Sequence, residues 1–114
     1  MAEQQPRISV PRPSLRRLAG GRAISARVTV TESGRKDAVL VEVYSAPLGN
    51  ELPVALGYTR FSRPQTKDVK LIAPKFVRRF LRPRSRLHAR VVLSQCSTAG
   101  YEHTAQSRIV LRRQ

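Results

Sequence analysis

The sequence contains a single cysteine, Cys96, among its 114 residues. One cysteine excludes an intramolecular disulfide framework and a zinc site made of clustered cysteines. It leaves open the redox state of the compartment in which the protein works. Because free cysteine is among the most often buried residue types, we interpret Cys96 as a small apolar side chain of a strand.

Aromatic side chains are also few, with three Tyr, three Phe and no Trp. Single-stranded nucleic acid is usually bound by aromatic side chains on which its bases stack, whereas Phe76 and Phe80 are predicted to belong to the core. Many proteins that read double-stranded DNA place a long helix in the major groove, and no segment here predicts such a helix. We therefore do not expect sequence-specific recognition of nucleic acid.

Long apolar runs are absent as well. No run approaches the roughly 18 residues that a membrane-spanning helix requires, so no transmembrane segment is predicted. The stretch MAEQQPRISVPRP lacks the basic segment followed by an apolar core that marks a secretory signal. Either the protein stays inside the cell or a signal has been removed, and the sequence leaves both open.

Acidic residues are scarce, seven against 22 basic ones, which gives a net charge of +15. Of the basic residues, 18 are arginines. Such a charge favours a polyanionic partner, namely nucleic acid, an anionic cell-wall polymer or an acidic lipid surface, without choosing among them. Arginine suits bidentate contacts with phosphate or carboxylate, but the excess could equally reflect the nucleotide bias of the genome.

The same scarcity argues against an enzyme. The acidic residues are scattered, and the sequence shows no glycine loop for phosphate, no metal-spaced His/Cys set and no nucleophile elbow. We expect no catalytic activity, no cofactor and no metal. A weaker alternative is a metal-dependent enzyme that uses His88, His103 and Cys96, because both histidines fall on neighbouring predicted strands. A solvated His88 is favoured, since the strand pattern turns it outward.

The sequence does contain a series of short segments in which apolar and polar residues alternate. The clearest is 24–31, where Ile24, Ala26, Val28 and Val30 share one face, and a similar segment follows at once, so the two are expected to pair antiparallel. In the third segment Val54, Leu56 and Tyr58 are predicted to face inward. The predicted strands are 24–31, 38–45, 52–61, 68–72, 86–95 and 101–113, with a seventh if RISV at 7–10 pairs.

Two short helices interrupt the strands. PSLRRLAGG predicts one helical turn with Ser14 as its N-cap and Leu15 and Leu18 on one face. APKFVRRFL predicts a second helix that ends at Pro83. Its predicted buried residues are Phe76, Val77, Phe80 and Leu81.

These elements predict an all-β fold, an antiparallel Ig-like β-sandwich of six to seven strands with one short crossover helix. The domain is expected to span 14–113, preceded by an extended N-terminal arm at 1–13. Pairing of RISV would bring part of that arm into a sheet.

The order of these parts resembles a known family. DVKL, the basic helix in APKFVRRFLRPRSRL, the two last strands in HARVVLSQCSTAGYEHTAQSRIVLRR and the opening ISVPRPSLRRLAGGRAISARVTV together resemble actinobacterial Ig-like or fibronectin-III-like modules of secreted and surface proteins. The resemblance covers about Arg7 to Arg113. It implies a sandwich fold and a role as an adhesive, spacer or appended module, and it carries over no active-site residues.

The candidate contact surface is the basic stretch around Pro83. Its arginines form a contiguous cationic patch able to neutralise phosphates or carboxylates, or they are only the solvent face of a helix and a strand. The sequence leaves both interpretations open. The residues are Arg78, Arg79, Arg82, Arg84, Arg86 and Arg90.

The sequence as a whole therefore predicts a non-catalytic binding or assembly module that presents an arginine-rich surface. The expected partner is another protein, further copies of the chain paired through a sheet edge, or an anionic polymer. The alternative is a small basic protein that contacts nucleic-acid phosphates non-specifically. We expect a secreted or cell-surface location, or a cytoplasmic one if no signal was removed.

Overall fold

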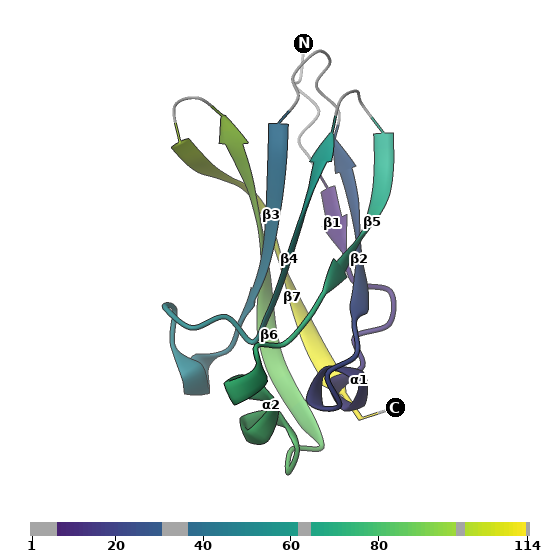
Figure 1. Cartoon of the computed structure of the whole chain (residues 1–114), viewed down its shortest axis with the longest axis vertical. Helices are drawn as coiled ribbons and strands as arrows, with labels where there is room; N and C mark the ends of the chain where they lie inside the picture. Colours follow the sequence, from purple (N-terminus) through teal and green to yellow (C-terminus); the bar gives the residue numbers. More distant parts are fainter. Residues whose placement is uncertain (1–6, 31–36, 62–64, 98–99, 114) are drawn as a thin grey trace.

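The computed structural model describes residues 7–30, 37–61, 65–97 and 100–113, and of residues 37, 96, 97 and 100–104 it describes only the backbone. The described residues form seven strands in two antiparallel sheets (Figure 1). One sheet has the order β1-β2-β5, from β1 (Arg7–Ser9), β2 (Ile24–Val30) and β5 (Gln65–Leu71). The other has the order β4-β3-β6-β7, from β4 (Ala55–Phe61), β3 (Asp37–Tyr44), β6 (Arg86–Ser97) and β7 (Gly100–Arg112). The predicted all-β, antiparallel class is confirmed.

The core lies between the two sheets, where β2, β3, β5 and β6 bury alternate side chains. On β2 these are the predicted residues Ile24, Ala26, Val28 and Val30, all buried. The predicted inward residues of β3, β5 and β6 are buried in the same way: Val39, Val41 and Val43; Val69 and Leu71; Leu87, Ala89, Val91 and Leu93.

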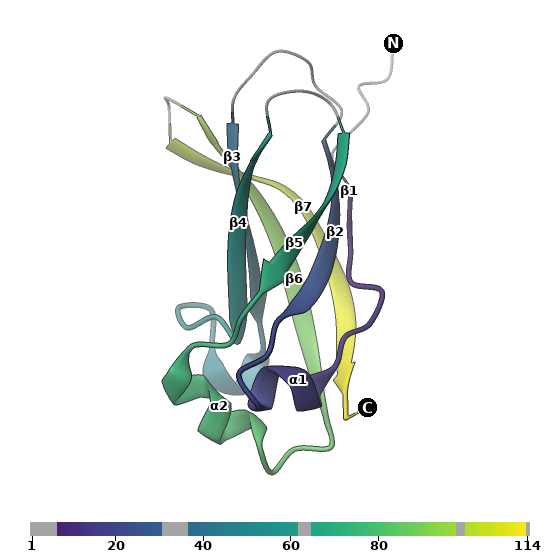
Figure 2. The same ribbon diagram turned by 45° about the vertical axis from the view of Figure 1, so that its right-hand side comes forward.

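Two short helices lie at one end of the molecule (Figure 2). In α1 (Leu15–Ala19) the predicted N-cap is confirmed, because the Ser14 side chain accepts a hydrogen bond of 3.2 Å from the backbone N–H of Arg17. Leu15 and Leu18 are buried. α2 (Lys75–Leu81) connects β5 in one sheet with β6 in the other, so the predicted crossover helix is also confirmed. A short 3-10 helix, η1 (Ala46–Leu48), follows β3.

The expected pairing of the first two long strands is wrong. β2 pairs with β1 and β5, whereas β3 pairs with β4 and β6 in the other sheet. Both strands carry an apolar face, and by lying in opposite sheets they turn those faces toward one shared core. Periodicity fixes the face of a strand and leaves its neighbour undetermined.

The inward set expected on the third segment is wrong in part. Val54 is buried, but Leu56 and Tyr58 are exposed by 37% and 69%. The regular strand begins only at Ala55, after Pro53, so Val54 and Ala55 are both buried and the alternation restarts from Ala55.

The expected burial of Phe76 is also wrong, since 67% of this residue is exposed. α2 has fewer than two turns, and it buries Val77 and Leu81, which stand four residues apart on one face. Phe80 packs half-buried against the core, while Phe76 stands beside the buried face and projects from the first turn.

β1 includes residues of the predicted N-terminal arm. Its three residues pair with β2, from Arg7 opposite Thr29 to Ser9 opposite Arg27. Residues 1–6 of that arm lie outside the described part of the chain.

Candidate functional site: an arginine pole

Five arginines from three separate segments surround one cavity at the helical end of the molecule. The cavity has a volume of about 610 Å³ and is also lined by Ala19 and Gly20. We call its arginines the arginine pole: Arg16, Arg17, Arg22, Arg82 and Arg113. No acidic side chain is among the described residues that line it, so the pole concentrates positive charge without a carboxylate to offset it.

Local structure explains why these side chains point outward. In α1 the burial of Leu15 and Leu18 leaves Arg16 and Arg17 on the solvent side. The burial of Leu81 in α2 places the next residue, Arg82, beyond the end of the helix. Because Leu111 is fully buried, β7 is held against the core, and the strand then carries the chain to Arg113 beside the two helices.

Backbone carbonyls hold part of the pole in place. Arg17 donates from Nε to the carbonyl of Ala23 at 2.9 Å. Arg113 donates from Nη1 to the carbonyl of Arg84 at 3.4 Å, and its backbone N–H donates to the carbonyl of Ser85 at 3.1 Å. Carbonyls orient guanidinium groups without neutralising them. The groups therefore keep their positive charge, and their remaining N–H donors can bind an anion.

The six arginines predicted as a contact surface fall in different surroundings. Arg82 belongs to the pole, and Arg79 and Arg86 are exposed. Arg84 is half-buried, with its guanidinium 4.0 Å from the centre of the Phe80 ring. Arg78, also half-buried, donates from Nε to the carbonyl of Ala73 at 3.1 Å. Four of the six thus lie on α2 or within three residues of its end, whereas Arg86 and Arg90 lie on β6.

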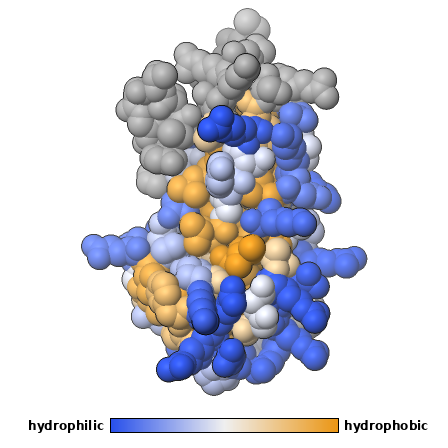
Figure 3. Space-filling model, viewed as in Figure 1, coloured by the Kyte–Doolittle hydropathy of each residue, from blue (hydrophilic) through white to orange (hydrophobic). Residues whose placement is uncertain are grey.

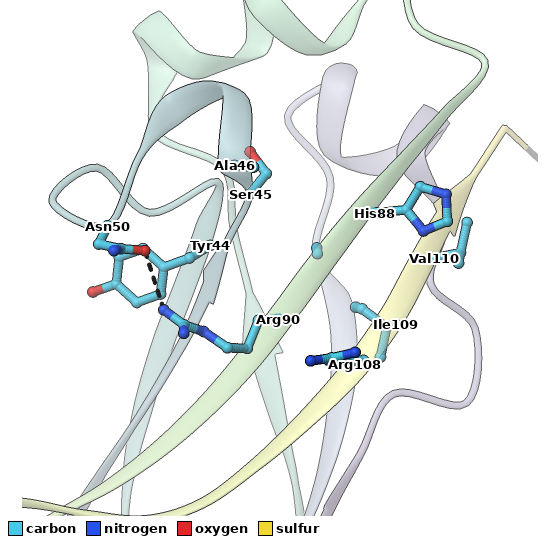
Figure 4. A pocket seen from close by; sticks show the side chains of 10 residues that line it. Tyr44, Ser45, Ala46, Asn50, His88, Arg90, Arg108, Ile109 and Val110 are labelled. Carbon is cyan, nitrogen blue, oxygen red and sulfur yellow. Dashed lines mark hydrogen bonds between the residues drawn. The ribbon is translucent and has the colours of Figure 1, made fainter.

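Arg90 lines a second cavity, of about 490 Å³, on the outer face of β6 and β7 (Figure 4). It donates from Nη2 to Oδ1 of Asn50 at 3.2 Å, and its guanidinium lies 6.0 Å from the centre of the Tyr44 ring. Arg108 stands directly opposite Arg90 in the strand pairing and lines the same cavity. Like charges at such a position destabilise a sheet, so an anion between them would relieve the repulsion.

Tyr44 lines this cavity and interacts with Glu42 on the same strand. The Tyr44 hydroxyl donates a hydrogen bond to the Glu42 carboxylate. Burial, followed by this hydrogen bond and the charge of Glu42, raises the pKa of Tyr44 to about 12, although the charge of Arg90 opposes the shift. Tyr44 therefore stays a neutral hydrogen-bond donor at physiological pH.

The metal site considered for His88, His103 and Cys96 is contradicted by the strand register. His88 pairs with Val110, whereas His103 pairs with Ser94, six residues further along β6. At 3.4 Å per residue this separates the two histidine positions by about 20 Å. Cys96 lies still further along β6. The exposure predicted for His88 is confirmed, and the predicted burial of Cys96 concerns a side chain outside the described part.

Sequence reasoning missed four members of the pole and Arg108. Arg16 and Arg17 carried a signal, because the same helix pattern that buries Leu15 and Leu18 turns both arginines outward. No pattern in the sequence indicated Arg22 and Arg113, since they reach the cavity only through the packing of α1, α2 and β7.

Within the described ranges, no helix is long and apolar enough to cross a membrane. Comparison of the chain with protein-family models, with curated proteins and with solved structures finds no match.

Proposed function

We propose that this protein is a non-catalytic Ig-like β-sandwich module that binds a polyanionic partner through the arginine pole. The strand order supports the Ig-like part of the proposal. The first, second and fifth strands form one sheet, and the fourth, third, sixth and seventh form the other. An Ig-like sandwich likewise has its first, second and fifth strands in one sheet and its third, sixth and seventh in the other. Its fourth strand joins the fifth in the constant type, whereas here β4 pairs with β3.

One observation carries the binding part, namely that five guanidinium groups from three segments converge on one cavity without a lining carboxylate among the described residues. Repulsion between them makes this arrangement unfavourable for an isolated domain. A partner with several closely spaced anionic groups would reverse the sign of that interaction, and each guanidinium can donate two parallel hydrogen bonds to one phosphate, sulfate or carboxylate.

The proposed mechanism is rigid presentation of charge. The two sheets fix α1, α2 and the end of β7, and these elements fix the backbone positions of the arginines. Backbone carbonyls also hold the side chains of Arg17 and Arg113 before the partner arrives. Pre-ordered donors lose less conformational freedom on binding than donors on a flexible tail. Binding of this kind is strongly salt-dependent, because each neutralised anionic group releases bound counterions.

The test compares two triple variants in the full chain with the same change in net charge. In the first, Arg22, Arg82 and Arg113 of the pole are each changed to Glu. In the second, Arg7, Arg60 and Lys67 are changed to Glu, and these residues lie on strands outside the pole. Affinity for a heparin oligosaccharide and for single-stranded oligothymidylate is measured by titration over a range of salt concentrations.

We expect the pole variant to bind heparin at least tenfold more weakly than the control variant. Its slope of log affinity against log salt on oligothymidylate should be flatter by about 0.7 for each lost phosphate contact. Equal losses in both variants would mean that the charge acts diffusely and would overturn the proposal. Tighter binding of oligothymidylate than of heparin at equal salt would instead support the non-specific nucleic-acid alternative.

A further inference from the structure

The large apolar side chains that are exposed in the described part of the chain all belong to one corner of the sandwich. They are Leu56, Tyr58, Ile72 and Phe76, exposed by 37%, 69%, 46% and 67%. We call this set the apolar corner. Figure 3 shows orange side chains gathered in the middle and lower left of the face on which β4 and β5 lie, with blue side chains around them.

The backbone makes the corner continuous. Leu56 on β4 and Ile72 after β5 form an antiparallel bridge, with N–H to carbonyl distances of 3.1 Å from Leu56 and 3.0 Å from Ile72. Tyr58 follows Leu56 by two residues on the same face of β4. Phe76 follows Ile72 by four residues, in the first turn of α2. The corner thus joins the two sheets and the crossover helix.

Basic residues are interleaved with these side chains. Lys70 precedes Ile72 by two residues on the same face, and Lys75 precedes Phe76 in α2. Arg60 and Arg79 follow Tyr58 and Phe76 by two and three residues, and all four basic residues are exposed. Two acidic residues lie on the neighbouring strands: Asp68 pairs with Arg27 at 3.6 Å, and Glu42, opposite Leu56, accepts a hydrogen bond from Tyr44. The four basic residues outnumber them.

We propose that the apolar corner docks on an anionic lipid surface, with Phe76 and Ile72 inserted among the headgroups and Lys70, Lys75 and Arg79 against the lipid phosphates. Apolar side chains that project between cationic ones are the composition that binds at such an interface, where electrostatic attraction and apolar burial add. Tyr58 is also suited to the headgroup region of the lipid surface, because its ring is apolar and its hydroxyl is polar.

Charge favours a lipid surface over a second copy of the chain as the occupant of the corner. Two copies of a chain with a net charge of +15 repel one another, and pairing of corners would bring lysines and arginines face to face. An anionic bilayer attracts the same residues. The proposal goes beyond the arginine pole, which uses different side chains.

The absence of tryptophan from the chain allows a direct test, because Phe76→Trp introduces a single indole into the apolar corner. This variant of the full chain is titrated with vesicles of phosphatidylcholine mixed with phosphatidylglycerol and with vesicles of phosphatidylcholine alone. We expect the indole emission to shift to shorter wavelength and to be quenched by brominated acyl chains in the anionic vesicles only.

Partitioning of variants onto the same anionic vesicles, measured by co-sedimentation, separates insertion from simple attraction. Phe76→Ser should lower the partition coefficient at least tenfold, and Phe76→Leu, which keeps an apolar side chain, should change it less than threefold. Lys75→Glu should weaken binding more than Arg7→Glu, a matched charge change on β1. Thermal unfolding of each variant verifies that it is folded.

Three results would overturn the proposal. One is an unchanged indole emission with anionic vesicles. Another is vesicle binding that Phe76→Ser leaves intact but the pole variant abolishes, which would leave the proposed function standing. The last is a dimer in sedimentation equilibrium that Phe76→Ser dissociates, because a second copy would then cover the corner.

Discussion

At the scale of single residues, Gly57 allows the edge strands of the two sheets to approach closely, because it has no side chain. A Cβ at this position of β4 would overlap the carbonyl oxygen of Lys70 on β5. The close approach allows the neighbouring hydrogen bonds between Leu56 and Ile72, which join the edge strands of the two sheets. The sequence alone offered no reason to distinguish Gly57 from a turn glycine.

Gly57→Ala should therefore force β4 and β5 apart. We expect a loss of about 2 kcal/mol in the free energy of unfolding, as is typical when a methyl group is forced into a packed site. The change is measured by urea unfolding followed by circular dichroism. Gly20→Ala is the control, because its Cβ would lie 3.4 Å from the Arg16 carbonyl, and it should change stability by no more than about 0.5 kcal/mol. Equal effects of both substitutions would contradict the role given to Gly57.

At the scale of elements, α2 divides the basic stretch into residues that build the fold and residues that remain available. Arg78 lies against Gly21, which has a positive φ of 78°, and a Cβ there would come within 2.8 Å of the Arg78 Nη1. The hydrogen bond to Ala73 orients the Arg78 side chain, and the contact with Gly21 ties α2 to the loop after α1. Arg79, one position further on, is exposed.

Arg78→Ala and Arg79→Ala should therefore separate the two roles. Arg78→Ala removes the hydrogen bond to Ala73 and the packing of the Arg78 side chain, so we expect a loss of about 1 to 2 kcal/mol in the free energy of unfolding. The second should change it by no more than about 0.5 kcal/mol. Thermal and urea unfolding compare the two variants. An equally stable Arg78→Ala would show that the helices hold their positions without this contact.

At the scale of the whole molecule, the net charge is +15. Between described side chains there is one ion pair, Arg27 with Asp68 at 3.6 Å, and both partners are largely exposed. A pair of this kind contributes about 1 kcal/mol or less. The outermost strands also carry basic residues, such as Arg60 on β4 and Arg108 on β7, which oppose edge-to-edge pairing of copies.

The folded state should accordingly gain stability from salt. Raising sodium chloride from about 0.01 M to about 0.15 M shortens the screening length from about 30 Å to about 8 Å, which weakens repulsion across the pole. We expect the melting temperature to rise by several degrees, measured by calorimetry. The rise should be smaller in the variant with Arg22, Arg82 and Arg113 changed to Glu. A melting temperature that falls with salt would mean that attraction between opposite charges outweighs repulsion between like charges in the folded state, and would contradict this prediction.

The sequence by itself determined the local structure. Alternation assigned the buried faces of β2, β3, β5 and β6, Ser14 marked the start of α1, and Pro83 marked the end of the second helical segment. These features depend on neighbours within a few residues, where periodicity and capping chemistry act. The same reasoning failed at Leu56, Tyr58 and Phe76, because a restarted alternation and a short helix changed which side faces the core.

The tertiary structure alone decided which segments meet. It placed β2 and β3 in opposite sheets, separated Arg90 from the arginines of α2, and brought Arg22 and Arg113 to the cavity that Arg16, Arg17 and Arg82 also line. It also exposed the apolar corner where β4 approaches β5. Such contacts join residues far apart in the chain, and the packing of both sheets on one core, not any local pattern, sets their geometry.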